Sequence, residues 1–272
     1  MAKQFLKKRQ EKSMKLKETV HFNWYKHLLL VLLLLLFFQS SAWITGADFA
    51  QVWSNRSQMT AFMARFLHPD FSYLPQLMMP LIKTLQMSFL GTVLGVVAAI
   101  PVSLLATTVV TESRWVSVPM RFLLGLVRTI PNLLLAALFV AIFGIGEATG
   151  VLTIAVFTFG MVSQLMFQAI ETIDFAPIEA AAAVGANKFQ VTVWAIIPQV
   201  ISQFASYTFY AFEVNVRAST VLGYVGAGGI GVILNASLAL LNYERVSIII
   251  LTILLTVAIV DFLSERVRRS FL

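Results

Sequence analysis

Eight polar side chains recur at alternating intervals of four and three residues within a long apolar segment. They are Gln199, Gln203, Ser206, Tyr210, Glu213, Arg217, Thr220 and Tyr224. On an α-helix this spacing places all of them on one face, because each residue advances about 100° around the axis. Ionisable groups are costly in hydrocarbon unless they face protein or water. We therefore expect this polar face to line either a helix interface or a translocation pathway.

Glu213 and Arg217 are one helical turn apart and can form an ion pair. The interpretation we favour is that the two charges neutralise each other inside a bundle. The alternative is that Arg217 binds an anionic solute in transit, because a guanidinium group matches phosphate-like oxyanions with paired hydrogen bonds. Asn215 lies on the opposite face, where we expect it to hydrogen-bond a neighbouring helix.

Motifs for other chemistries are missing from the sequence. No G-x-x-x-x-G-K-[ST] sequence is present, so we expect no ATP site of the P-loop kind. The three histidines lack metal-ligand spacing, cysteine is absent, and no nucleophile is paired with a base. The string Gly226–Gly231 fits G-x-G-x-x-G, but it follows a membrane span rather than a strand, so we interpret it as coincidence. We predict no catalytic residue, metal site or cofactor in this chain.

The composition predicts an all-α, polytopic membrane protein. Hydrophobic residues make up 58% of the chain and charged ones only 12%, and the mean hydropathy is +0.83. Crossing about 30 Å of hydrocarbon takes roughly 20 apolar residues. Six segments qualify, namely Leu28–Thr45, Leu81–Val109, Pro119–Phe143, Ala148–Ile170, Val193–Leu222 and Val246–Leu263. We expect one transmembrane domain over residues 28–272. Its second span contains Gly91 and Gly95, which we expect to allow close helix packing.

The basic residues predict the orientation. Eight Lys and Arg residues precede the first span, and Arg266, Arg268 and Arg269 follow the last one. Six spans put both termini on one side, and cytoplasmic flanks are the basic ones, so residues 1–27 and the C-terminus are predicted to be cytoplasmic. The formal net charge of +7 is then a topology signal, and we expect no nucleic-acid partner. In an alternative interpretation, the first hydrophobic segment is a cleavable signal peptide; we favour its retention.

A short helix is predicted between the fourth and fifth spans, within a loop over residues 171–192. The sequence from Glu179 to Pro198 is EAAAAVGANKFQVTVWAIIP. Glu179, Ala180 and Ala181 begin the helix and Gly185 ends it, because glycine favours the left-handed conformation that closes helices. Pro198 lies just inside the next span. An external, glycine-rich segment is predicted over residues 223–245, with a tight turn at Gly226, Gly228, Gly229 and Gly231 that is buried in protein or lines a cavity.

Three strings resemble the permease subunits of phosphonate-type ABC importers. They are VRTIPNLLLA (Val127–Ala136), the Glu179–Pro198 segment, and FEVNVRASTVLGYVGAGGIG (Phe212–Gly231). The likeness runs from about Leu81 to Ser264. The Glu179–Pro198 segment resembles the coupling loop of ABC importers in general, with Ala195 and Ile197 departing from the usual Ile and Leu.

The resemblance implies a type I ABC-importer fold and a set of partners. These are a second copy of the chain, a cytoplasmic ATPase dimer that binds ATP and magnesium, an external solute-binding protein, and membrane lipid. Glu179–Gly185 would dock in a groove of the ATPase, with Pro198 completing the motif. Gln199, Gln203, Ser206, Tyr210, Glu213, Arg217 and Thr220 would line the pathway, and the four glycines would form a gate. Gly185→Val would then uncouple transport.

The implied function is the import of phosphonate or related phosphorus oxyanions across a bacterial cell membrane. Two alternatives remain, a methionine or amino-acid importer of the same layout and an ATP-independent secondary transporter. A coupling helix has no evident purpose in the latter. The sequence leaves the particular oxyanion open.

Overall fold

The computed structural model describes residues 24–47 and 49–271. By its internal contacts the chain divides into two compact units, residues 1–61 and 62–272. Most of the basic N-terminal segment, including all of its lysines except Lys26, lies outside the described residues.

The first unit contains the first predicted span. Helix α2 (Trp24–Thr45) covers it and starts four residues earlier, with no buried residue. Its 22 residues extend about 33 Å, which is enough to cross the hydrocarbon of a membrane. Two shorter helices follow, α3 (Phe49–Ser54) and α4 (Arg56–Phe66), and the last one continues into the second unit.

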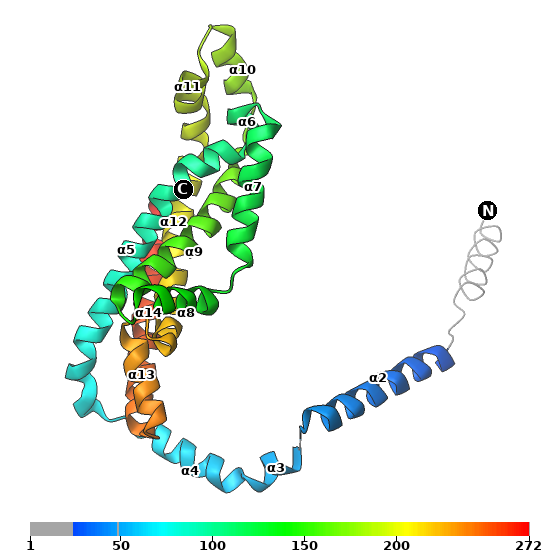
Figure 1. The fold of residues 1–272 in the computed structure, drawn as a ribbon, viewed down its shortest axis with the longest axis vertical. Helices are drawn as coiled ribbons and strands as arrows, with labels where there is room; N and C mark the ends of the chain where they lie inside the picture. Colours follow the sequence, from blue (N-terminus) through cyan, green and yellow to red (C-terminus); the bar gives the residue numbers. More distant parts are fainter. Residues whose placement is uncertain (1–23, 48, 272) are drawn as a thin grey trace, which may run out of the picture. The chain divides into compact units, whose positions relative to one another are not determined.

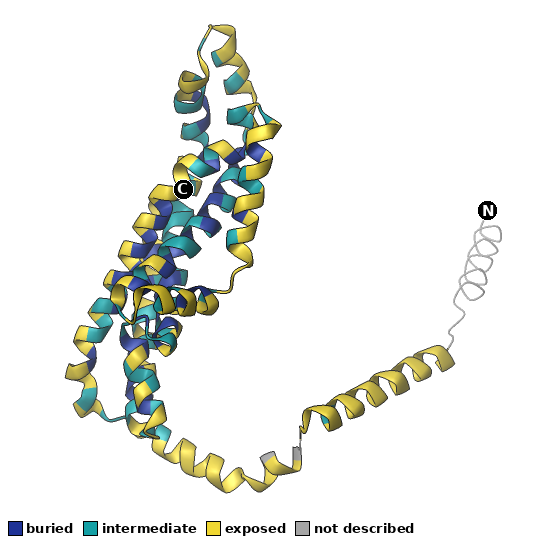
Figure 2. Cartoon of the chain, viewed as in Figure 1, coloured by how far each residue is buried: buried dark blue, intermediate teal, exposed yellow. Residues whose placement is uncertain are grey.

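Four long helices form the second unit. They are α5 (Leu74–Ala106), α9 (Glu147–Ile170), α12 (Ile197–Leu222) and α14 (Tyr243–Phe271). Figure 1 shows them side by side in an elongated bundle, with α10 (Ala176–Ala183) and α11 (Lys188–Val191) projecting from one end and α13 (Ile230–Ala239) at the other. Buried residues line the inside of this bundle, whereas α10 and α11 contain none (Figure 2).

Helices α5 and α9 pack closely through the glycines predicted for this purpose. A Cβ atom on Gly91 would lie 2.6 Å from Cγ2 of Ile154, and one on Gly95 would lie 2.5 Å from the carbonyl oxygen of Ala155. No side chain fits at either distance, so the helices approach to backbone contact there. The prediction of a close helix contact at Gly91 and Gly95 is confirmed.

The third predicted span is bent, and a second bend follows the fifth predicted span. The third consists of α7 (Arg114–Thr129) and α8 (Asn132–Phe143), which meet at 87°. Pro131 explains the break, because a proline disfavours helical geometry in the residue before it, and Ile130 is extended with ψ 117°. Proline alone permits a kink, whereas the turn here is close to perpendicular. Helix α12 and α13 form the second bent pair, at 47°.

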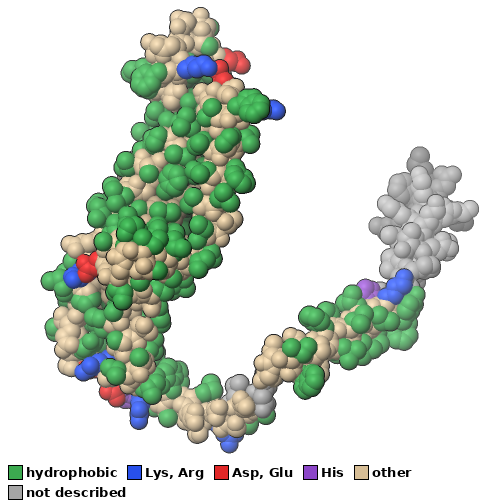
Figure 3. All heavy atoms as spheres, in the orientation of Figure 1, with side chains coloured by type: hydrophobic (Ala, Val, Ile, Leu, Met, Phe, Trp, Pro, Cys, Tyr) green, Lys and Arg blue, Asp and Glu red, His purple; other side chains and the backbone are tan. Residues whose placement is uncertain are grey.

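The described residues thus contain four continuous helices that could span a membrane, and six spans if each bent pair counts as one. The six apolar segments predicted from the sequence are all helical, and the all-α membrane architecture is confirmed. On the visible face of the bundle, hydrophobic side chains predominate (Figure 3). A short α6 (Thr108–Thr111) connects α5 to α7.

Candidate functional site

Helix α10 is the short helix predicted before the fifth span. It starts at Ala176, three residues earlier than expected, because Oδ1 of Asp174 accepts a hydrogen bond from the Ala176 N–H (3.0 Å) and Pro177 occupies the first turn. Glu179 and Ala180 are exposed on it, and Ala181 is half-buried.

Gly185 ends α10 as predicted. Its φ is +81°, and two hydrogen bonds complete the closure, from the Gly185 N–H to the Ala182 carbonyl (3.0 Å) and from the Ala186 N–H to the Ala181 carbonyl (3.1 Å). This pair is a Schellman motif, which requires a left-handed residue at the position of Gly185. No atom lies within 4 Å of the place where a Cβ would be, so glycine is needed here for its backbone and not for space.

The chain returns to the bundle through α11 and a π-helical turn (Thr192–Ile196) that leads into α12. Asn187 and Gln190 exchange hydrogen bonds of 2.9 Å between side chain and backbone at the start of α11. This capping box fixes the direction of the helix. Pro198 lies in the first turn of α12, as predicted, whereas the π-helical turn before it was not foreseen.

A hollow of about 430 Å³ lies between the two arms of this projection. Its walls are formed by small and apolar side chains and one amide, from Ala181, Val184, Gly185, Ala186, Gln190 and Trp194. Val184 is 85% exposed and Trp194 is 78% exposed. Large apolar groups that stay exposed in this way are typical of a surface that contacts another protein.

Two ion pairs connect residues 171–192 to α5, α6 and α7. Nζ of Lys188 lies 2.6 Å from a carboxylate oxygen of Glu112, just after α6. Arg121 on α7 pairs with Glu171 at the end of α9, and its Nε donates to the carbonyl of Ala106 at the end of α5 (2.7 Å). No sequence signal indicated these pairs, because their members are 50 or more residues apart.

Gln199, in the first turn of α12, makes three hydrogen bonds to backbone groups. Its Oε1 accepts a hydrogen bond from the Asp174 N–H (3.1 Å), and its Nε2 donates to the Asp174 carbonyl (3.2 Å) and to the Ala195 carbonyl (2.7 Å). The side-chain amide is therefore bonded to the backbone of Asp174, before α10, and to that of Ala195 in the π-helical turn. That Gln199 lines the pathway stays a prediction.

The rest of the polar face of α12 stays partly open within one copy of the chain. Gln203, Tyr210 and Arg217 are exposed, and Ser206, Glu213 and Thr220 are half-buried. The hydroxyl groups of Ser206 and Thr220 donate to backbone carbonyls of their own helix. The buried residues of α12 lie on its other face, so the face with the polar stripe is the one that the bundle covers least.

Arg217 pairs with two carboxylates, not one. It donates to Glu213, as the sequence indicated, and its second partner is Asp261 on α14 at 2.8 Å. Asp261 lies 44 residues away in sequence, and nothing in the pattern around it predicted this contact. One cation between two carboxylates gives this group a formal charge of −1. Both carboxylates already hold the guanidinium, which favours mutual neutralisation over binding of an anion by Arg217.

Asn215 connects three helices on the buried face of α12. Its Nδ2 donates to the hydroxyl of Thr92 on α5 (2.8 Å) and to that of Thr158 on α9 (2.7 Å). Its side chain is fully buried. The prediction that Asn215 hydrogen-bonds a neighbouring helix is confirmed, with two helices rather than one.

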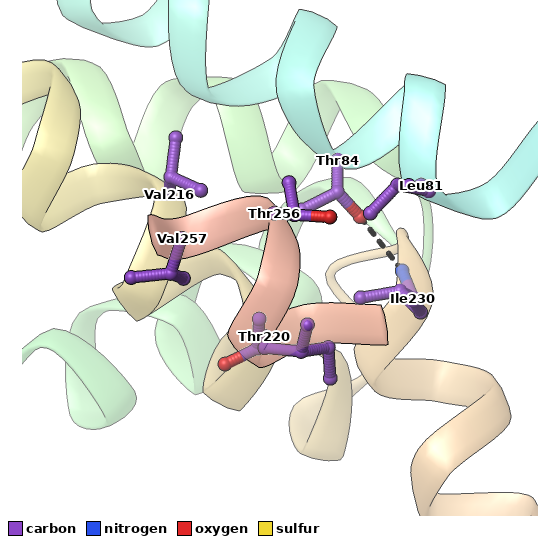
Figure 4. Close-up of a pocket in the computed structure, with 8 residues that line it drawn as sticks. Leu81, Thr84, Val216, Thr220, Ile230, Thr256 and Val257 are labelled. Carbon is purple, nitrogen blue, oxygen red and sulfur yellow. Dashed lines mark hydrogen bonds between the residues drawn. The ribbon is translucent and has the colours of Figure 1, made fainter. Parts of the chain in front are cut away.

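The glycine-rich turn is a packed joint between α12 and α13. Gly226, Gly228 and Gly229 have positive φ, and a Cβ on Gly231 would lie 2.0 Å from the Thr220 carbonyl. The Ile230 N–H donates to Oγ1 of Thr84 on α5 (2.8 Å), as Figure 4 shows. The cavity beside them holds about 10 Å³, room for one water at most. The expected external segment over 223–245 is thus mostly helical, with a buried turn.

Residues 91–272 match the family of binding-protein-dependent transport system inner membrane components. The chain belongs to this family. It is therefore the permease of an ABC importer, a multi-pass inner-membrane protein without enzymatic activity or cofactor of its own, and its partners are an ATPase and a solute-binding protein. Membership excludes the ATP-independent secondary transporter.

Two relatives of the permease are named as transporters of phosphite or phosphate. It is 39% identical over 232 residues to the phosphite transport system permease protein PtxC of Stutzerimonas stutzeri, covering 85% of this chain and 84% of that one. It is 34% identical to the phosphate-import permease protein PhnE of Mycolicibacterium smegmatis, covering 86% of this chain and 42% of the relative. In fold it matches the inward-facing MetNI methionine ABC transporter, with a TM-score of 0.67 over 75% of this chain and 99% of that chain, at 20% identity.

Proposed function

We propose that the permease imports phosphite, phosphonate or a related phosphorus oxyanion. The observation that carries this proposal is the 39% identity to the phosphite permease PtxC across most of both chains. The likeness to MetNI, at 20% identity, bears on the fold alone and not on the solute.

Helix α10 is the proposed contact with the ATPase. It projects from the bundle, has no buried residue and is flanked by exposed apolar groups, so it can enter a groove on a partner. Glu179, Ala180 and Ala181 would lie in that groove, Gly185 would set where the helix ends, and Pro198 would start the span that moves with it. ATP and magnesium are bound by the ATPase, whose closure would switch the permease between inward and outward access.

The proposed pathway runs along the open polar face of α12. Gln203, Ser206, Tyr210, Glu213, Arg217 and Thr220 would line it. A second copy of the chain would close the pathway, because one copy leaves this face uncovered. The net negative group at Arg217 would not attract anions, so selectivity would come mainly from the solute-binding protein. Gly226, Gly228, Gly229 and Gly231 would form the gate, moving as one body with α5 and α9 because the turn is packed against them.

We also propose that the α10–α11 end of the bundle is cytoplasmic, and with it both termini. The basic residues before α2 and after the last span support this orientation, because cytoplasmic flanks carry the excess of Lys and Arg. The solute-binding protein would then deliver solute at the α13 end, and lipid would cover the apolar sides.

The test is reconstitution of the permease with the ATPase and binding protein encoded beside it. ATP hydrolysis in proteoliposomes is measured with phosphite, methylphosphonate, phosphate and methionine. We expect stimulation by one or more of the phosphorus oxyanions and none by methionine. Stimulation by methionine alone would overturn the proposed solute while leaving the importer architecture in place.

A further inference from the structure

We infer that Gln199 is a positioning residue that makes the segment around α10 move together with α12. The inference rests on the proposed contact between α10 and the ATPase. Gln199 contacts no solute and no nucleotide in this proposal. Its function would be mechanical, because its amide holds both backbone groups of Asp174, whose carboxylate accepts from the first N–H of α10.

The hydrogen bonds form a continuous path from α10 to α12. The Asp174 carboxylate accepts from the Ala176 N–H in the first turn of α10, and the Asp174 backbone is held by Gln199 in the first turn of α12. Along the chain, the same two points are 25 residues apart, by way of α10, α11 and the π-helical turn. The amide thus provides a direct connection where the covalent one is long and contains an irregular turn.

This connection has no hydrogen-bonded equivalent elsewhere in the described residues. The bonds of Gln199 are the only ones that join residues 171–187 to residues 192–222 there. The ion pairs of Lys188 and Arg121 connect the segment to α5, α6 and α7 instead. Apolar packing of Ile173 and Ile178 against the core also holds the segment, but packing is not directional, whereas a hydrogen bond requires a defined geometry.

Local chemistry explains why a glutamine suits this position. Pro198 has no N–H and begins the helix, and the turn before it is π-helical. The Gln199 Nε2 donates to the Ala195 carbonyl within that turn. A side-chain amide that both donates and accepts can bind a peptide group on each side. Glutamate at this position could accept from the Asp174 N–H but could donate to neither carbonyl.

The consequence is that a displacement of α10 reaches the polar face of α12. Glu213 and Arg217 lie on the same helix as Gln199, 14 and 18 residues further along. Helix α12 is continuous between them, so it can act as one rigid element. If the amide is lost, α10 can follow the ATPase without carrying α12 with it.

The test compares Gln199→Glu and Gln199→Leu with the same changes at Gln168. Gln168 is exposed in the last turn of α9, at the same end of the bundle, and its side chain makes no hydrogen bond to other described residues. In the full complex with ATPase and binding protein, we expect both Gln199 variants to co-purify normally and to hydrolyse ATP. Phosphite-stimulated uptake per ATP should fall about fivefold or more, as for loss of a typical coupling between sites. The Gln168 variants should behave as wild type.

A distance measurement separates this inference from the proposed solute. The chain has no cysteine, so spin labels can be placed on Cys introduced at exposed Ala182 and Ile201. We expect the distance distribution to broaden in Gln199→Leu and to stay narrow in Gln168→Leu, with or without solute. If wild type is not stimulated by phosphite, the proposed solute fails and the distance measurement still decides the role of Gln199. Unchanged distances and normal uptake per ATP in both Gln199 variants would overturn it.

Discussion

Replacing Gly185 tests whether the end of α10 sets the contact with the ATPase. The residue has φ +81°, and the surroundings leave room for a side chain. A substitution therefore costs only backbone strain, about 1–2 kcal/mol for an ordinary L-residue, and more for a β-branched one. That energy corresponds to about a 5- to 30-fold change in the fraction of α10 that ends correctly. Asparagine tolerates the left-handed conformation and should cost least.

The expected order of damage is Asn, then Ala, then Val. The assay is ATPase co-purification and stimulation in the reconstituted complex, with the chain's fold monitored by size-exclusion chromatography. We expect Gly185→Asn to stay near wild type, and Gly185→Val to fold while losing at least about fivefold of its stimulation. Gly125→Ala is the control, because this glycine is helical and also has free space around it. Full coupling in Gly185→Val, or equal damage in Gly185→Asn, would contradict the reasoning.

Three further substitutions test contacts between helices of the bundle. Arg217→Gln leaves two carboxylates facing each other across α12 and α14 and should lower the melting temperature of the purified permease by about 2–4 °C. Adding Asp261→Asn should restore part of that loss. No recovery in the double variant would argue against a stabilising group of Glu213, Arg217 and Asp261. Asn215→Leu removes two buried hydrogen bonds and should destabilise the protein by about 1–3 kcal/mol, measured by thermal unfolding, with exposed Gln86→Leu as a control that leaves stability unchanged. Gly95→Leu cannot fit against Ala155 and should greatly reduce the yield of monodisperse protein, whereas Gly125→Leu should not; a normal yield from Gly95→Leu would mean that α5 and α9 separate easily.

The helices could be predicted from the sequence because the hydrocarbon layer of a membrane fixes both the length and the apolar composition of a segment that crosses it. A chain in lipid must satisfy its backbone hydrogen bonds within each segment, so apolar runs of sufficient length become helices. The end of α10 at Gly185 and the start of α12 near Pro198 could also be predicted, since each depends on a local property of one residue. The angle of the bend at Pro131 could not be predicted from the sequence, because proline permits a break in the helix while packing against neighbouring helices sets the angle.

The contacts that define the candidate site could not be predicted from the sequence to the same extent, for a physical reason. A helical periodicity gives the face of each residue but not the identity of what packs against that face. Asn215 could be placed on the buried side of α12, but Thr92 and Thr158 could not be named as its partners. The spacing of Gln199 places it on the polar face of α12. Only the fold shows that its amide is hydrogen-bonded to the backbone of Asp174 and Ala195.

Arg217 illustrates how such a contact changes a functional argument. With Glu213 alone, the pair would be neutral, and binding of an anion by the guanidinium would remain an option. Asp261 makes the group net negative, and both carboxylates contact the same guanidinium nitrogen, Nη2. A phosphorus oxyanion that approached Arg217 would be repelled by the net charge of −1 on this group. Neutralisation that fixes α12 against α14 is therefore the better account of this arginine. It also fits a permease that leaves the choice of solute to its binding protein.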